Sequence, residues 1–194
     1  MIHRSVDQLI DNVLPAAADY FMAEQELSAV YAAATNDLSA CGGEAAKAKR
    51  LAAQVAIAID GLADRAGHAL QLKPNAVRQQ VGPLCSLGTA QRAGCIERVR
   101  AVADAYQHDH LSNPQHPITS NDDVLVVAPG FGIDGYGVGK WDGVEVLVHQ
   151  INGELWKVLG DVPAAVHGWF HFFLIHGAKQ TTSEISVCGL RVWP

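Results

Sequence analysis

Residues 106–127 read YQHDHLSNPQHPITSNDDVLVV, and the character of the chain changes within them. Before this segment, apolar residues recur at the three- and four-residue spacing of amphipathic helices. After it come short apolar runs separated by glycine and asparagine turn signals, as expected of strands. Pro114 and Pro117 lie between the two patterns, and the residues before them cannot continue a helix. The segment therefore divides a helical first half from a β-rich second half.

The first half predicts an antiparallel helical bundle. Ser5 and Gln8 form a capping-box pattern, and Pro74 suits the first turn of a helix. Thr89 is expected to cap the last helix, and Pro15 to kink or restart the first one. The four expected helices cover residues 5–34, 44–70, 74–82 and 89–108.

The second half predicts a small, mainly antiparallel sheet with one helix. Residues 124–128 are a continuous apolar run, which favours a strand buried on both faces. The pair Asn152-Gly153 is a hairpin signal, and Asp161 is expected to cap a short helix. The expected strands cover residues 124–128, 144–148, 154–159 and 185–193.

These patterns predict an α+β fold with a helical bundle over residues 1–110 and a β-rich unit with one helix over residues 122–194. The border is expected between Leu111 and Asp122. The N-terminus has no apolar stretch typical of a signal peptide, and no apolar run approaches the roughly 20 residues of a membrane helix. We therefore expect a soluble, cytoplasmic protein without a membrane partner.

Charge is unevenly distributed along the chain. The net charge of −6 argues against strong generic binding to nucleic acids. Residues 47–100 nevertheless contain nine basic and three acidic residues, whereas residues 106–194 contain four basic and nine acidic ones. The helical half presents either an ordinary solvated face or a basic face for an anionic partner such as RNA. The four cysteines form no Cys-x-x-Cys pair, which speaks against a zinc ribbon.

Histidines gather at the junction between the two halves. His108, His110 and His116, together with nearby aspartates, form a dense set of nitrogen and oxygen donors. Two imidazoles and a carboxylate can complete a Zn, Mn or Fe site, and such a site predicts a hydrolase. The alternative is a solvated histidine at a helix C-terminus, which the helix dipole favours.

A second pair of histidines, His167 and His171, lies four residues apart on the last predicted helix. This spacing suits joint metal ligation, but Gly168 stands where H-E-x-x-H proteases have their glutamate. A half-buried amphipathic helix is the preferred interpretation. In that helix Trp169 and Phe172 are expected to form an exposed patch for a partner.

A glycine-rich stretch follows the apolar run and formally contains the G-x-G-x-x-G pattern of phosphate-binding loops. A dinucleotide-binding fold needs a helix directly after the glycines, whereas residues 141–143 lead into another expected strand. A tight loop that uses glycine for positive φ angles is the alternative. The glycines are Gly130, Gly132, Gly135, Gly137 and Gly139.

The last predicted helix of the first half ends in RVRAVADAYQH, residues 98–108. This sequence resembles the last-helix motif of HEPN domains, helical bundles in which an arginine, a polar residue and a histidine form a metal-independent ribonuclease site. Together with the Ser/Asn-Asp run and the glycine-rich stretch that follow it, this segment also resembles a motif of uncharacterised bacterial proteins. The HEPN resemblance implies His108 as general acid or base and Arg100 as the group that stabilises the pentacoordinate phosphate.

Helical geometry adds two expectations to this resemblance. Asp104 lies four residues before His108, where it can orient the imidazole ring. Arg100 lies eight residues before His108 and about 80° away around the helix, so the two do not converge well on one phosphate. A bundle that has lost catalysis is therefore an alternative to a nuclease.

Three functions are consistent with the sequence. We expect a non-catalytic interaction module whose Ala-rich helices pair in a homo-oligomer or with another protein. The alternatives are a HEPN-like ribonuclease with Arg100, Asp104 and His108 as catalytic residues, and a metal-dependent hydrolase with His108, His110 and His116 as ligands. The sequence identifies no cofactor.

Overall fold

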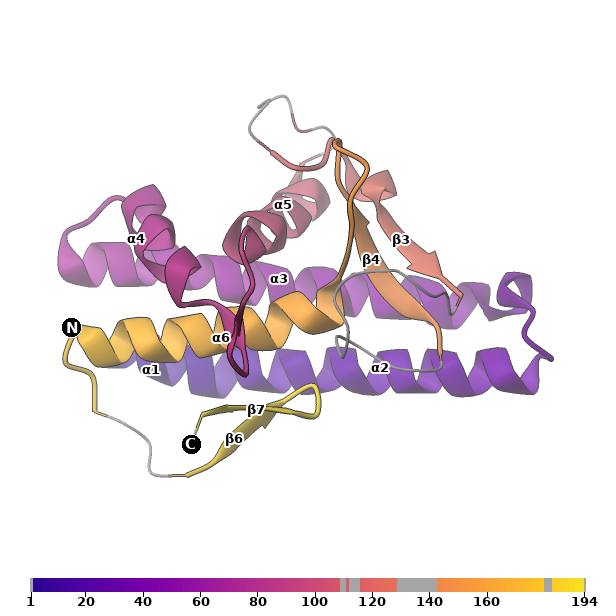
Figure 1. Ribbon diagram of the computed structural model, residues 1–194, viewed down its shortest axis with the longest axis horizontal. Coiled ribbons are helices and arrows are strands. Elements are labelled where there is room, and N and C mark those ends of the chain that lie inside the picture. Colours follow the sequence, from indigo (N-terminus) through magenta and orange to yellow (C-terminus); the bar gives the residue numbers. More distant parts are fainter. Residues whose placement is uncertain (1, 109–110, 112–115, 129–142, 180–182, 194) are drawn as a thin grey trace.

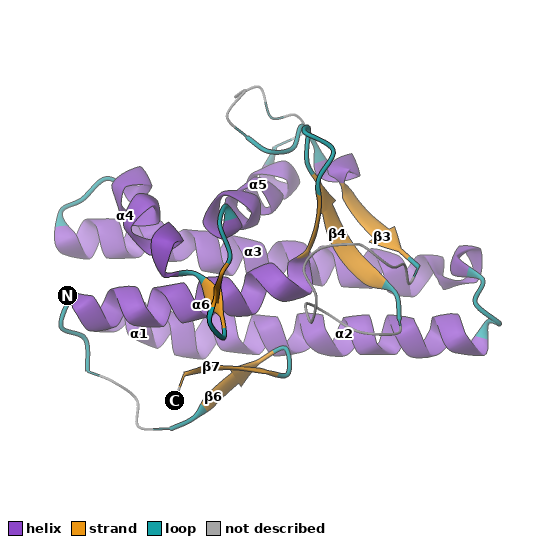
Figure 2. Cartoon of the chain, in the orientation of Figure 1, coloured by secondary structure: helices purple, strands orange, loops and turns teal. Residues whose placement is uncertain are grey.

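The computed structural model has an α+β architecture in which N-terminal helices are followed by small antiparallel sheets and one further helix (Figure 1, Figure 2). The predicted fold class is confirmed. The structure describes residues 2–108, 111, 116–128, 143–179 and 183–193.

The first long helical segment contains one π-helical stretch, which lies just before Pro15. Proline has no N–H group and its ring crowds the preceding turn, so a widened turn lies where the sequence predicts a kink or restart. The predicted capping box does not form, because Ser5 is inside the helix and its N–H donates to the carbonyl of Ile2 at 2.9 Å. The parts are α1 (His3–Gln8), η1 (Leu9–Val13) and α2 (Leu14–Ala33).

The longest helix, α3 (Gly42–Leu70), runs back along α2 (Figure 1). A short 3-10 turn, η2 (Leu38–Cys41), joins them, and the Asp37 carboxylate caps it by accepting the N–H of Ser39 at 2.9 Å. Small side chains on the inner face of α3 allow neighbouring helices to approach closely. The buried alanines of this face are Ala48, Ala52, Ala56, Ala63 and Ala66.

Two further helices complete the first half, with a small hairpin between them. Pro74 begins the first of them as predicted. Thr89 is not a helix cap, because it lies in the turn of the hairpin beside Gly88, which has a φ of 56°. The last helix starts only after Gly94. In chain order the elements are α4 (Pro74–Val81), η3 (Gly82–Leu84), β1 (Ser86–Leu87), β2 (Ala90–Gln91) and α5 (Cys95–Gln107).

Three antiparallel strands form a sheet in the order β3-β4-β5. The expectation that residues 124–128 are buried on both faces is wrong, because β3 is an edge strand and only Val124 in it is buried. The central strand β4 has four of its five residues buried. Asn152-Gly153 forms the predicted turn, with a φ of 86° at Gly153. The strands are β3 (Val124–Val127), β4 (Glu145–His149) and β5 (Leu155–Lys157).

The C-terminal segment is a hairpin of β6 (Ile185–Val187) and β7 (Leu190–Trp193) instead of the single expected strand. Cys188 and Gly189 have φ angles of 51° and 77° and form its turn. Two consecutive positive φ angles are typical of a tight hairpin turn, which the alternating apolar pattern alone did not reveal.

The central helix is α6 (Val158–Ile175), which packs against α3, α4 and α5 and against strands of all three sheets. Trp169 and Phe172 are each 1% exposed, so the predicted exposed patch at these residues is wrong. Protein covers most of the helix, whereas His167, His171 and Leu174 are half-buried and Ile175 is exposed. Among the described residues α6 alone is long and apolar enough to span a membrane, and 78% of it is buried within the protein. This burial is what a core helix of a soluble protein shows.

One hydrophobic cluster contains residues of the helices and of the sheet, from Leu9 in η1 to Trp193 in β7. In Figure 1, α6 lies in front of the left half of α2 and α3, and β3 and β4 lie over the right half of these two helices. The division into units at residues 111–122 stays a prediction.

Candidate functional site

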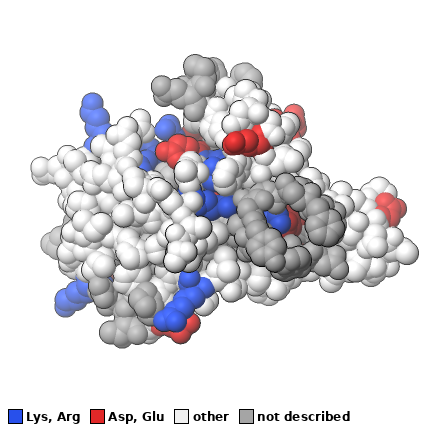
Figure 3. Space-filling view, viewed as in Figure 1, with Lys and Arg blue, Asp and Glu red and all other residues white. Residues whose placement is uncertain are grey.

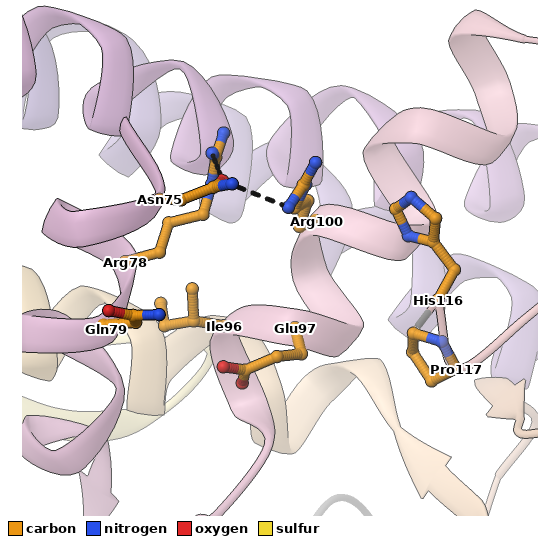
Figure 4. Close-up of a pocket in the computed structure, with 8 residues that line it drawn as sticks. All are labelled: Asn75, Arg78, Gln79, Ile96, Glu97, Arg100, His116 and Pro117. Atoms are coloured by element: carbon orange, nitrogen blue, oxygen red, sulfur yellow. Dashed lines mark hydrogen bonds between the residues drawn. The ribbon is translucent and has the colours of Figure 1, made fainter. Parts of the chain in front are cut away.

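A cavity of about 270 Å³ opens between α4, α5 and the segment that leads to η4 (Asn121–Asp123) and β3 (Figure 4). Six of its eight lining residues carry polar side chains, namely two arginines, two amides, a carboxylate and an imidazole. The lining residues are Asn75, Arg78, Gln79, Ile96, Glu97, Arg100, His116 and Pro117.

Helical spacing brings these side chains to one place. Asn75, Arg78 and Gln79 lie on one face of α4, because residues three and four apart are neighbours on a helix. Ile96 and Arg100 are related in the same way on α5. The cavity lies where these two faces meet.

The segment that carries His116 is fixed by backbone contacts and one carboxylate. The N–H of Leu111 donates to the carbonyl of Thr119 at 2.9 Å. Asp123 Oδ2 accepts the N–H groups of Thr119 and Ser120 at 2.7 and 3.2 Å. Burial acts to raise the pKa of Asp123, but these hydrogen bonds outweigh it and lower the pKa below its ordinary value of 3.8.

Arg78 is a structural bridge between α4 and α3. Its Nε and Nη2 atoms donate to the two carboxylate oxygens of Asp60, both at 2.8 Å. Its Nη1 atom donates to Asn75 Oδ1 at 3.0 Å. Every nitrogen of this guanidinium is engaged inside the protein, in the bidentate geometry that arginine forms with carboxylates.

Arg100 is held more loosely, although the two arginines share one partner. Its Nη1 atom donates to Asn75 Oδ1 at 3.3 Å, and its Nε atom lies 3.3 Å from Asp104 Oδ2. Figure 4 shows Asn75 between the two arginines. The Arg100 side chain is 32% exposed, and of its five N–H donors only those on two nitrogens have partners among the described residues.

Asp104 connects Arg100 to a histidine from another part of the chain. His116 Nε2 lies 3.5 Å from Asp104 Oδ2, and the His116 side chain is 11% exposed. An arginine, a carboxylate and an imidazole therefore adjoin one another at the edge of the cavity. This grouping can bind an oxyanion, and it also holds a candidate proton acceptor next to a cation.

The predicted catalytic residues are only partly brought together. Arg100 and Asp104 are in contact, but His108 ends α5 in an extended conformation with its side chain exposed. Its backbone N–H donates to the carbonyl of Asp104 at 2.9 Å. Among the described residues the ring beside the Asp104 carboxylate is that of His116, and the role assigned to His108 stays a prediction.

The predicted metal ligands do not assemble in the described part of the chain. His110 lies outside the described residues. No group of three or more His, Cys, Asp or Glu side chains suited to a metal ion is found among those that are described. The glycine-rich stretch at residues 129–142, for which phosphate binding was one interpretation, also lies outside them.

Two of the nine basic residues of the helical half do not add to its surface charge. Arg92 and Arg98 are 5% and 3% exposed, and both bind the buried carboxylate of Asp161 at 2.6 to 2.8 Å. Asp161 lies in the first turn of α6 and is not the predicted N-cap, a position occupied by Lys157. Figure 3 shows the basic side chains of the visible face in separate places, several of them beside acidic ones.

A second set of buried polar groups connects α2 to β4. The Glu24 carboxylate accepts the N–H of Val146 at 2.9 Å and the hydroxyl of Tyr20. Burial and the neighbouring Glu24 charge raise the pKa of Tyr20 well above its ordinary value of 10.0. Lys157 on β5 binds Glu145 on β4 at 2.8 Å. No local pattern predicts these contacts, because they join elements far apart in the chain.

No family model matches this chain, and no curated protein or solved structure is significantly similar to it. The resemblance to HEPN domains therefore rests on the residues of α5 alone.

Proposed function

We propose that this protein is a non-catalytic interaction module that binds a carboxylate of a partner protein at Arg100. The observation that carries this proposal is the incomplete use of the Arg100 guanidinium, which is 32% exposed and makes two polar contacts within the described part of the chain, at 3.3 Å each. A planar guanidinium with unused N–H donors matches the two oxygens of a carboxylate. Arg78, each of whose three nitrogens donates a hydrogen bond inside the protein, serves as the scaffold beside it.

The charges around the cavity favour a single carboxylate over a polyanion. Glu97 lines the cavity, Asp104 contacts Arg100 and Asp60 binds Arg78. A nucleic-acid backbone would bring several phosphates towards these three carboxylates. One acidic side chain of a partner protein needs only one arginine. Its repulsion from the three carboxylates is therefore smaller than that of several phosphates.

The carboxylate proposal is tested by titration with the tripeptide acetyl-Gly-Glu-Gly-amide, with acetyl-Gly-Gln-Gly-amide as the uncharged control. We expect the glutamate peptide to shift the Nε–H resonance of Arg100 in NMR spectra. Replacing Arg100 by glutamine is expected to weaken binding at least about tenfold, because a hydrogen bond to a charged group contributes about 1.5–3 kcal/mol.

The matched control is Arg65→Gln, which removes an exposed arginine of α3 that does not line the cavity. This variant should bind the glutamate peptide as the wild type does. Equal binding of the two peptides, or unchanged binding by Arg100→Gln, would overturn the proposal.

We also propose that the protein self-associates and is cytoplasmic. The alanines that motivated a homo-oligomer are buried inside the chain, so a second copy would have to contact other surfaces. Sedimentation equilibrium tests this point, since a monomeric mass that does not change with concentration would exclude self-association.

RNA cleavage is a second candidate, favoured by the contact between Asp104 and His116 beside Arg100. In this reaction a neutral His116 takes the proton of a ribose 2′-hydroxyl, and the 2′-oxygen attacks the adjacent phosphorus. The 5′-oxygen leaves with a proton from the protonated imidazole, which gives a 2′,3′-cyclic phosphate. Arg100 stabilises the negative charge of the pentacoordinate phosphate.

Cleavage of a labelled single-stranded RNA by the wild type and two variants tests this candidate. Loss of cleavage in a folded His116→Ala variant, with formation of a cyclic phosphate by the wild type, would support it. Loss in His108→Ala alone would support the residue predicted from the HEPN resemblance instead. Absence of cleavage by the wild type leaves the carboxylate-binding proposal as the function to test.

A further inference from the structure

A pair of imidazoles lies on α6, away from the cavity described above. The rings of His167 and His171 are neighbours, with their centroids 4.3 Å apart and their planes inclined by 42°. Both residues are half-buried, although the rest of this helix is largely core. Two imidazoles four residues apart on a helix point in the same direction and can share one metal ion.

The hydrogen bonding of His167 leaves one of its nitrogens available. Its Nδ1 atom lies 3.0 Å from the carbonyl oxygen of Leu84 and 3.2 Å from Ser86 Oγ. A carbonyl oxygen only accepts, so we assign the ring proton to Nδ1, which leaves a lone pair on Nε2. Histidine ligands commonly donate the other ring N–H to a backbone carbonyl in this way.

His171 is suited to ligation for a different reason. It has no hydrogen-bond partner among the described residues, and the Trp193 ring meets it edge-on at a centroid distance of 5.3 Å. Burial and the neighbouring His167 lower the pKa of His171 below its ordinary value of 6.5. With no hydrogen-bond partner among the described residues, its ring nitrogens are open to a metal ion.

The backbone around the pair is fixed. A Cβ atom added at Gly168 would lie 2.7 Å from Cys85 Sγ and 3.3 Å from the carbonyl oxygen of Val81. This close approach holds α6 against the segment that carries Leu84, the hydrogen-bond partner of His167. Ligands whose orientation is set by packing before the ion arrives are typical of built metal sites.

We propose that His167 and His171 bind a divalent late transition-metal ion, such as Zn²⁺ or Cu²⁺, through their Nε2 atoms. Imidazole is a preferred ligand of these ions, with Cu²⁺ the tightest of the series. No third protein ligand is found among the described residues, so water or a group from a partner completes the coordination. This site is separate from the predicted ligands His108 and His116, and it does not depend on the proposed function.

Calorimetric titration of the untagged full-length chain with Cu²⁺ and with Zn²⁺ tests the proposal. We expect one ion to bind per chain, and His167→Ala and His171→Ala each to weaken binding at least about tenfold through loss of a direct ligand. The matched control is His176→Ala at the end of the same helix, whose imidazole contacts Phe172 and Gln80. Unchanged affinity in the two test variants would overturn the proposal.

Two spectroscopic measurements on the Cu²⁺ complex complement the calorimetric titrations. Paramagnetic resonance of the Cu²⁺ complex should show coupling to two imidazole nitrogens. Cu²⁺ should also quench the fluorescence of Trp193, and Trp193→Phe should remove that quenched component. Absence of nitrogen coupling, or metal binding that is lost in His108→Ala or His116→Ala instead, would overturn the assignment to α6.

Discussion

Two carboxylates in this protein each contact two nitrogen-bearing side chains, but their surroundings differ. Asp161 is 2% exposed and binds Arg92 and Arg98 at 2.6 and 2.8 Å. Asp104 is 19% exposed and lies 3.3 and 3.5 Å from Arg100 and His116. The first group has short hydrogen bonds and no access to solvent. The second has longer contacts and opens onto a cavity.

The difference shows what burial does to the same arrangement of charges. Inside the protein an unpaired charge is very costly, so every donor of the Asp161 cluster needs a partner. Arg92 Nη2 donates to the carbonyl of Lys157 at 3.1 Å, and the Arg98 guanidinium stacks on Trp156 with its Cζ 3.9 Å from the ring centroid. At the surface water replaces missing partners, so Arg100 can keep donors for a ligand.

The largest expected effect is on the stability of the sealed cluster. Replacing Asp161 by alanine leaves two buried guanidinium groups without their carboxylate, and we expect a loss of about 3–5 kcal/mol in the free energy of unfolding. Urea denaturation followed by circular dichroism measures this loss. A loss below about 1 kcal/mol would mean that the two regions do not differ as described.

A smaller effect is expected for the open carboxylate. Asp104→Asn removes a partly exposed charge with long contacts, so it should cost less than about 1 kcal/mol of stability. It also removes a negative charge next to Arg100, and we expect the affinity for the glutamate peptide to rise about two- to fivefold. Calorimetry with the peptide measures the affinity, and a decrease would show that Asp104 orients Arg100 instead of competing with the ligand.

The smallest effect concerns the segment that carries His116. Because the pKa of Asp123 is lowered on folding, its hydrogen bonds contribute fully above pH 3.8, the ordinary value. They are lost as the pH falls below 3.8 through the pKa of the folded state. The amide resonance of Thr119, which donates to Asp123, should titrate with a midpoint below pH 3.8 and should not titrate in Asp123→Asn. A midpoint at or above 3.8 would contradict this.

Local signals predicted several elements correctly because they act within a few residues. Pro74 begins α4, Asn152-Gly153 forms a turn and α5 ends at Gln107, directly before His108. The prediction was wrong where the conformation of a residue depended on the residues next to it. Thr89 resembles a helix cap by composition, but the adjacent Gly88 adopts a positive φ and forms a hairpin turn.

Burial was predicted less well than secondary structure. Periodicity identified one apolar face of α6, with Phe170 buried as expected, but it could not show that other elements cover the opposite face. Trp169 is therefore buried instead of exposed. The valine-rich run of β3 is less buried than predicted. Such a run is expected in the centre of a sheet, but β3 lies at the edge.

The sequence by itself determined the α+β class and the helical first half, because apolar spacing and turn signals act within a few residues. Only the tertiary structure decided that His116 joins Asp104, that Asp161 is sealed between two arginines and that α6 is central. These features depend on residues far apart in the chain. Their partners are chosen by packing of the whole chain and by the cost of burying unpaired charge, which no local pattern encodes.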